Sequence, residues 1–219
     1  MMTQITASDG HVLECWLARA EGQSRGGLVI LQEIFGVTDQ LKSLAETYAK
    51  LGYDVAIPAL FDRKEKGAVI PFSDAARGLE LMQSTDPVET MLDIDAAVRA
   101  LAEKGGKVGV MGFCWGGGLA LRAAQKLDIA GAVIFYGTRL QQYLDSPLKA
   151  PVIGHFGSTD DHTPPEVIEQ VKAYLPELEV HIYDAGHAFA NDARPAAYAP
   201  EAAALAHERS KAFLAAHIG

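Results

Sequence analysis

The fold of this chain is decided by residues 107–125, KVGVMGFCWGGGLALRAAQ. They predict a buried strand, a tight glycine-rich turn and a helix, with Cys114 at the centre of a G-x-C-x-G pattern. A strand, turn and helix in this order form a nucleophile elbow, whose central residue projects above the edge of the sheet. The positive end of the helix dipole favours a thiolate there. The alternative interpretation is a buried structural cysteine beside a glycine-rich turn.

The rest of the chain alternates apolar runs of strand length with amphipathic runs of helix length. Strands that are apolar on both faces predict a mostly parallel sheet covered by helices on both sides, preceded here by a hairpin. We therefore expect a single α/β-hydrolase domain over residues 1–219. The expected strands are 3–7, 11–18, 27–32, 53–58, 107–111, 130–135, 151–156 and 179–183, and the expected helices are 38–51, 86–102, 117–125, 200–216 and one that opens with a capped turn at 163–166.

Charge and composition exclude some partners. The net charge of −9 argues against binding to nucleic acid or to an anionic membrane surface. The two cysteines, Cys15 and Cys114, stand in different sequence contexts, so no disulfide is expected and Cys15 reads as a buried strand residue. No signal segment or membrane span is visible. We expect a cytoplasmic protein that is a monomer or a small homo-oligomer.

A cysteine nucleophile needs a base and an acid, and in this fold they follow it in the order acid, then histidine, each in a loop beyond a strand. Asp160 follows the strand 151–156 and is the expected acid, with Asp161 as the neighbouring alternative. His187 follows the last strand and is the expected base. His162 lies near the acid but in the wrong place in the order. The remaining histidines are expected to be solvent-facing or structural: His11, His155, His181, His207 and His217.

The first core strand ends in the run Gln32-Glu33-Ile34-Phe35-Gly36. In this fold the loop supplies one backbone N–H of the oxyanion hole and the residue after the nucleophile supplies the other, so the candidates are Ile34 and Trp115. Burial of Glu33 beside apolar residues would disfavour its charged form and favour a hydrogen bond to a neighbour. The alternative for Glu33 is a surface loop residue or a helix cap.

Four segments together resemble the dienelactone hydrolase family, also called carboxymethylenebutenolidase, a cysteine branch of the α/β-hydrolase fold. They are residues 32–36, 112–117, the Asp160 loop and residues 186–189. The resemblance implies a Cys114–His187–Asp160 triad. It also implies that Glu33 is a fourth catalytic residue, which takes the thiol proton when substrate binds.

The chain departs from the family where substrate is held. Family members grip a substrate carboxylate with two arginines, one of them four residues after the histidine, and that position here is Asn191, with Arg194 nearby. Arg77 is the nearest candidate for the other arginine. Tyr136 resembles a pocket tyrosine of the family, and the alternative is a strand-end aromatic that packs under a loop. We place Tyr136, Arg77 and Phe35 in the expected substrate pocket.

The expected function is hydrolysis of small lactones or activated esters through a cysteine acyl-enzyme. One alternative is a broad carboxylesterase or an acyltransferase with another substrate. The other is a non-catalytic ligand-binding protein that has kept the fold. No metal and no cofactor is expected, because no residue cluster has metal-ligand spacing and no nucleotide-binding fingerprint is present.

Overall fold

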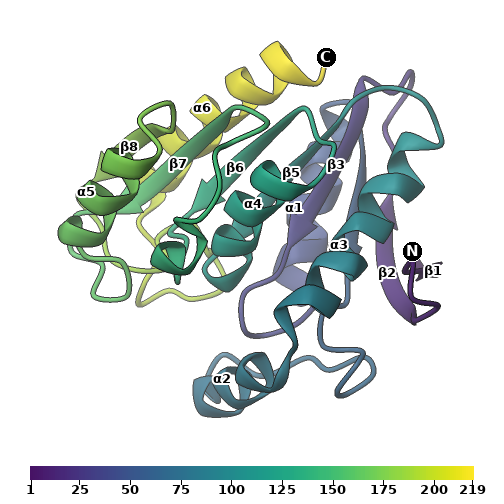
Figure 1. The fold of residues 1–219 in the computed structure, drawn as a ribbon, viewed down its shortest axis with the longest axis horizontal. Coiled ribbons are helices and arrows are strands. Elements are labelled where there is room, and N and C mark those ends of the chain that lie inside the picture. The colour runs from purple at the N-terminus through teal and green to yellow at the C-terminus, as the bar shows by residue number, and fades with distance from the viewer. The chain divides into compact units, whose positions relative to one another are not determined.

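A computed structural model describes all residues, 1–219, and the chain divides into two compact units. The first unit comprises Met1–Val108 with Ile218, and the second comprises Gly109–His217 with Gly219. Each unit is a layer of strands with helices against it (Figure 1).

The first unit opens with the predicted hairpin, β1 (Met2–Thr6) and β2 (Val12–Ala18). Strand β2 also pairs antiparallel with β4 (Tyr53–Pro58), and β4 pairs parallel with β3 (Gly26–Leu31). All six residues of β3 are buried, as expected for a strand covered on both faces. Cys15 is fully buried on β2, which confirms its prediction as a strand residue.

Two of the unit's helices begin where the sequence predicted. Helix α1 (Asp39–Lys50) begins after Thr38, whose hydroxyl accepts a hydrogen bond from the N–H of Leu41. Helix α3 (Pro87–Ala102) begins after Asp86, which caps two N–H groups of its first turn. These caps satisfy donors that a helix cannot pair within itself. The two helices cover opposite faces of the strand layer (Figure 1).

Helix α2 (Ala75–Ser84) was missed by the sequence analysis. Gly78 in its centre lowers the helical signal of the segment. The structure explains this glycine, because a Cβ atom at position 78 would overlap the carbonyl oxygen of Ile34. The glycine therefore allows helix α2 to lie directly against the loop that follows β3.

The second unit has four parallel strands in chain order: β5 (Val108–Phe113), β6 (Gly131–Phe135), β7 (Val152–Gly157) and β8 (Glu179–Tyr183). The first three are buried throughout, whereas β8 is partly exposed. The helices of this unit are α4 (Trp115–Lys126), the short 3₁₀ helix η1 (Leu140–Tyr143), α5 (Pro165–Tyr174) and α6 (Pro200–His217). Figure 1 shows helices α4 and α5 on one face of the four strands and α6 on the other.

The predicted capped start of helix α5 is wrong, although the helix itself is present. The helix begins after Pro164, and no side chain caps it. The hydroxyl of Thr163 instead donates to the carbonyl oxygen of Gly137 at 2.7 Å. Proline has no N–H, so Pro165 removes one of the two donors that a cap at Thr163 would have bound.

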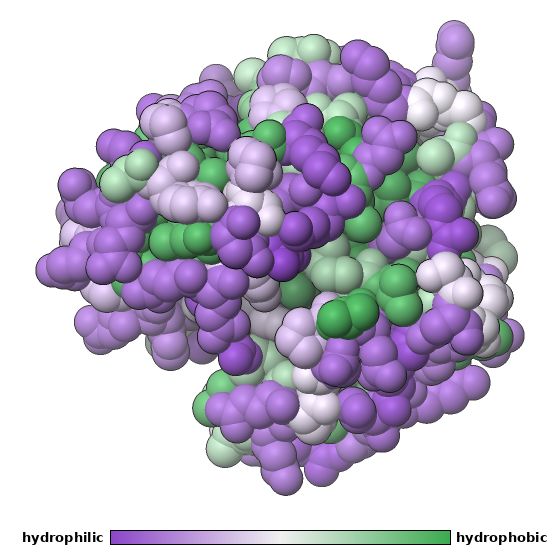
Figure 2. All heavy atoms as spheres, viewed as in Figure 1, coloured by the Kyte–Doolittle hydropathy of each residue, from purple (hydrophilic) through white to green (hydrophobic).

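The surface drawn in Figure 2 is mostly hydrophilic, with hydrophobic residues showing between the polar ones. The apolar residues, 49% of the sequence, instead supply the buried strands and the helix faces against them. None of the helices combines the length and the apolar character needed to span a bilayer.

Candidate active site

The turn between β5 and α4 forms the predicted elbow around Cys114. Cys114 has φ 53° and ψ −116°, a strained conformation for a residue other than glycine. Its N–H donates to the carbonyl oxygen of Phe135 at 3.0 Å, and its own carbonyl oxygen accepts from the N–H groups of Gly117 and Thr138, each at 3.0 Å. These bonds hold the strained backbone in place. The strained conformation is thus held by hydrogen bonds to the end of β6 and to the loop that follows it, as well as by the turn itself.

The glycines of the motif are required by close contacts. A Cβ atom on Gly112 would overlap the carbonyl oxygen of Gly116, and one on Gly117 would press against the backbone of Gly137. Cys114 stands at the N-terminus of α4, where no side chain caps the first turn. The first-turn N–H groups and the helix dipole there favour negative charge near the sulfur.

The structure brings Cys114, His187 and Asp160 together. His187, in the loop after β8, is hydrogen-bonded to Cys114. The Nδ1 atom of its ring lies 2.8 Å from Oδ2 of Asp160. The other oxygen of Asp160 accepts from the N–H groups of His162 and Thr163, at 2.8 and 3.3 Å. Asp160 is 2% exposed, whereas Asp161 is exposed, so the geometry selects Asp160 as the partner of His187.

The charges of His187 and Asp160 stabilise each other. Burial alone lowers the pKa of His187, but hydrogen bonds to Asp160 and Cys114 outweigh it and raise that pKa to about 10. Burial alone would raise the pKa of Asp160, but hydrogen bonds from His187 and two backbone N–H groups lower it below its ordinary value. A protonated imidazole between a carboxylate and a sulfur is therefore the favoured state at neutral pH.

Two further rings enclose His187. The ring of Tyr136 meets it edge-on, with centroids 5.2 Å apart, and Tyr136 itself is buried with φ 38°. The ring of His162 lies 4.4 Å from that of His187. Partial burial and the charges of His187 and Arg194 lower the pKa of His162. The chain order of acid and histidine leaves His162 outside the predicted triad, but its position two residues after Asp160 is a signal in the sequence that it could contact His187.

In the first unit, the loop after β3 holds the predicted residues Glu33, Ile34 and Phe35. The side chain of Gln32 fixes this loop, because it donates to the carbonyl oxygen of Glu33 at 3.2 Å and accepts from the N–H of Leu60 at 3.1 Å. Glu33 is 5% exposed, so the alternative of a surface loop residue is excluded. Phe35 is also buried and meets the ring of Phe72 edge-on at 4.9 Å.

Arg77 and Asn191, at the two positions predicted from the arginines that bind a substrate carboxylate, are each hydrogen-bonded to other residues of the protein. Arg77 lies on α2 and donates to both carboxylate oxygens of Glu65 at 2.7 Å, in an exposed ion pair. Asn191 is buried, and its side-chain oxygen accepts from the N–H of Ala193 at 3.1 Å. Arg194 is only partly exposed and lies near enough to His162 for its charge to affect that ring. A positive side chain therefore lies within electrostatic range of His162, three positions after Asn191.

Comparisons with known proteins identify the family of the chain. Residues 13–218 match the profile of the Dienelactone hydrolase family. The chain belongs to the dienelactone hydrolase family. Carboxymethylenebutenolidase from Pseudomonas putida is 32% identical to it, over 96% of this chain and 94% of that protein. As a member of this family, the chain is a carboxylic ester hydrolase.

Solved structures of the family support the fold class. The crystal structure of a putative dienelactone hydrolase from Klebsiella pneumoniae has a TM-score of 0.82 and 26% identity, covering 98% of this chain and 99% of that one. A dienelactone hydrolase-like promiscuous phosphotriesterase from metagenomic libraries also has a TM-score of 0.82, at 19% identity, covering 100% of this chain and 99% of that one. The predicted α/β-hydrolase fold with a mostly parallel sheet is confirmed.

Proposed function

We propose that this dienelactone hydrolase family member hydrolyses small lactones or activated esters through a thioester on Cys114. The observation that carries the proposal is the chain of contacts from Cys114 to His187 to Asp160. An elbow cysteine with a charged imidazole beside it is the arrangement that activates a thiol as a nucleophile. The two free cysteines support a reducing compartment such as the cytoplasm.

In the first half of the reaction, the thiol of Cys114 gives its proton to the carboxylate of Glu33, and its Sγ atom attacks the carbonyl carbon and forms a C–S bond. The carbonyl oxygen becomes an oxyanion, which the backbone N–H groups of Trp115 and Ile34 would receive. One such donor is typically worth about 3 kcal/mol in the transition state. The C–O bond then breaks, and His187 gives its proton to the leaving oxygen. In a lactone that oxygen stays tethered to the acyl group.

In the second half, water attacks the thioester carbon while His187 takes a proton from it. The C–S bond breaks, the sulfur leaves as a thiolate that takes back the proton held by Glu33, and the product is a carboxylic acid with its alcohol. Asp160 keeps the imidazole oriented through both halves, because it binds Nδ1 and leaves Nε2 for the transferred proton. A thiolate leaves readily, which suits esters and lactones with good leaving groups.

Glu33 separates two forms of this mechanism. In the first form, the imidazolium of His187, whose pKa is raised, pairs with a thiolate that exists before substrate binds. The family resemblance implies instead a resting thiol, whose proton Glu33 accepts when substrate binds. We propose the second form, in which Glu33→Gln slows acylation and leaves folding and ligand binding intact. Alkylation by iodoacetamide tests it: free Cys114 should react slowly near neutral pH, and a rate typical of an ionised cysteine would assign Glu33 a structural role.

An activated aryl ester tests the whole proposal. The enzyme should release the aryl alcohol in a burst equal to the enzyme concentration, followed by turnover, and the trapped intermediate should carry the acyl group on Cys114 by mass spectrometry. A ligand-binding protein would show neither. A panel of lactones with and without a free carboxylate would then define the substrate, and would show whether Tyr136, Phe35 and Arg77 contribute to its binding.

A further inference from the structure

A second histidine of the same unit sits inside a buried hydrogen-bonded chain. His155, on β7, is fully buried. Its Nδ1 atom lies 2.8 Å from the hydroxyl of Tyr183 at the end of β8, and its Nε2 atom lies 3.0 Å from the hydroxyl of Ser210 on α6. One imidazole ring thus joins two strands to the helix behind them.

The direction of each hydrogen bond follows from its neighbours. Ser210 donates its hydroxyl proton to the carbonyl oxygen of Ala206 at 2.8 Å, so it accepts from Nε2–H of His155. The Nδ1 atom of His155 then accepts from the Tyr183 hydroxyl, whose oxygen accepts from Arg209 at 3.0 Å. Every proton of the chain is therefore committed in one direction. Ser210 does not act as a second nucleophile, because it is buried and its proton points away from the histidine.

Burial, together with the charges around it, keeps the ring of His155 neutral. His181 of β8 stacks on it at 5.7 Å, and His207 and Arg209 approach from α6. Burial, with these neighbours, lowers the pKa of His155 to about 3. A proton on Nδ1 would also face a hydroxyl that already accepts from Arg209. The chain of hydrogen bonds is thus constant across the working pH range.

The position of this chain links it to the triad. Tyr183 ends the strand before the His187 loop, and its carbonyl oxygen accepts from the N–H groups of Ser158 and Ala185, each at 2.8 Å. Ser158 belongs to the loop that carries Asp160. The carbonyl oxygen of His155 accepts from the N–H of Tyr136 at 2.7 Å. The loops that hold the acid, the base and the neighbouring tyrosine are therefore all attached to His155 or Tyr183.

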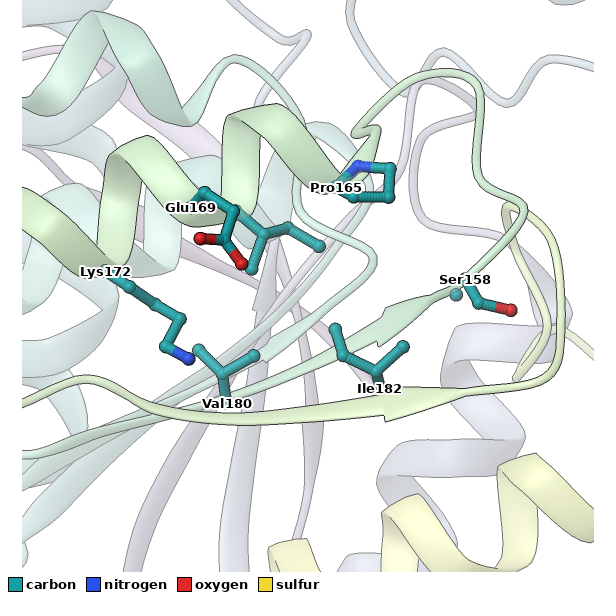
Figure 3. Close-up of a pocket in the computed structure, with 8 residues that line it drawn as sticks. Ser158, Pro165, Glu169, Lys172, Val180 and Ile182 are labelled. Atoms are coloured by element: carbon teal, nitrogen blue, oxygen red, sulfur yellow. The ribbon is translucent and has the colours of Figure 1, made fainter.

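The opposite face of β8 offers little support. Val180 and Ile182 point toward α5 and line a cavity of 130 Å³ between that helix and the strand (Figure 3). Ile182 is 51% exposed. Because side chains alternate along a strand, His181 and Tyr183 point the other way, toward α6. The side-chain support of this edge strand therefore comes mainly from the α6 side.

We propose that Ser210, His155, Tyr183 and Arg209 are positioning residues that hold the His187 and Asp160 loops at their working distance. The proposal rests on the proposed function, since the distance it sets is that of the proposed triad. Small displacements of a catalytic group can cost large factors in rate. Breaking the chain should therefore lower turnover even in protein that remains folded.

Variants at both ends of the chain test the proposal. Tyr183→Phe and Ser210→Ala each remove one hydroxyl, and Arg209→Met removes the terminal donor at a partly exposed position. In protein shown to be folded by circular dichroism, we expect kcat for an activated ester to fall about tenfold, with KM within about twofold. Tyr174→Phe and Ser84→Ala are matched controls on exposed helix surfaces and should be unchanged.

A second measurement does not depend on hydrolysis. The NMR signal of the His187 Nδ1 proton reports its hydrogen bond to Asp160, and we expect it to shift in the three variants and not in the controls. If folded variants show lower melting temperatures but unchanged kcat and an unchanged His187 signal, the chain is only structural and the proposal is overturned. If Tyr183→Phe and Ser210→Ala do not fold, Arg209→Met decides by the same two measurements. A wild type that fails to hydrolyse esters while the signal still shifts would overturn the proposed function and leave the positioning role standing.

Discussion

His187 and His155 lie in the same unit, each between two polar partners, and their environments shift their pKa values in opposite directions. The partners of His187 are a carboxylate and a sulfur, which raise its pKa to about 10. Those of His155 are two hydroxyls, within a cluster that also holds Arg209, and its pKa falls to about 3. One ring is set to carry a proton and the other to remain neutral.

The difference shows that the hydrogen-bond count does not decide what a histidine does. Both rings are largely buried, and both have each nitrogen occupied. The charge of the partners decides, because burial disfavours the imidazolium at both sites and only an anionic partner reverses that effect. Chemistry is therefore expected at His187 and structural support at His155.

Removal of the sulfur should have the largest effect. Cys114→Ala takes away the nucleophile, and we expect ester hydrolysis to fall by at least about 10³-fold with the fold unchanged. Cys114→Ser should retain at most weak activity, because the surrounding groups are arranged for a thiol. Initial rates with an activated ester, together with circular dichroism, measure both effects.

The matched control is Cys15→Ala, since Cys15 is buried in the first unit on β2. That variant should keep the activity of the wild type per folded molecule. Turnover in Cys114→Ala comparable to that of the wild type would contradict the covalent mechanism. It would also contradict a catalytic role for His187 as opposed to the structural role of His155.

The anionic partner of His187 should come next. Asp160→Asn removes the charge that holds the imidazolium, and we expect kcat to fall by about 10²- to 10⁴-fold, as for other triad acids. His187→Ala should also abolish hydrolysis. Asp161→Asn is the control, because Asp161 is exposed, and it should change kcat by no more than about twofold. The assignment fails if Asp161→Asn proves the more damaging of the two.

The two histidines should also give stability opposite pH dependences. The folded state binds the His187 proton more tightly than the unfolded chain, so this contribution is complete below about pH 6.5 and is lost as pH rises toward about 10. His155 binds its proton less tightly when folded, so its contribution is lost as pH falls from about 6.5 toward about 3. Each slope can reach about 1.4 kcal/mol per pH unit.

Urea unfolding between pH 4 and pH 9 measures these slopes. His187→Asn should flatten the alkaline side and leave the acid side unchanged, while His155→Gln should do the reverse. An alkaline slope that persists in His187→Asn would mean that His187 does not hold its proton above neutral pH.

The smallest effect is expected at His162. Its ring contacts His187 but lies outside the triad, and its own pKa is lowered, so it carries little charge at neutral pH. His162→Ala should change kcat/KM by no more than about fivefold, which corresponds to about 1 kcal/mol. His162→Phe, which keeps a ring against His187, should change it less. A loss as large as that of Asp160→Asn would place His162 among the catalytic residues.

Much of the fold could be predicted because it is written in local patterns. Apolar runs marked the strands to within about two residues, and the predicted helices 38–51 and 86–102 match the starts of α1 and α3. Helix α2 was missed because Gly78 lowers the helical signal of the segment. The glycine is required by its contact with the carbonyl oxygen of Ile34, which is distant in sequence, and not by the helix itself. The cap at Thr163 was wrong for the same kind of reason, since its hydroxyl binds Gly137 from another loop.

The candidate site divides in the same way. The elbow and the order of acid and histidine follow from sequence, because each lies at a recognisable strand end. The choice of Asp160 over Asp161 depends on how one loop turns, and the Ser210–His155–Tyr183 chain joins residues that look ordinary in their own segments. Long-range hydrogen bonds between side chains leave no periodic trace in a sequence.

The positive φ angles have a consequence for engineering. Apart from glycine, only Cys114, Tyr136, Arg139 and Ala188 have positive φ, and all four lie in the second unit. Cys114 is the proposed nucleophile, Ala188 adjoins His187 in sequence and Tyr136 touches its ring. Each such residue costs about 1 kcal/mol or more. Selection for heat resistance alone would thus favour glycine at these four positions, because glycine adopts a positive φ without this cost. The added backbone freedom would loosen the proposed catalytic centre, so such a screen should measure turnover as well as melting temperature.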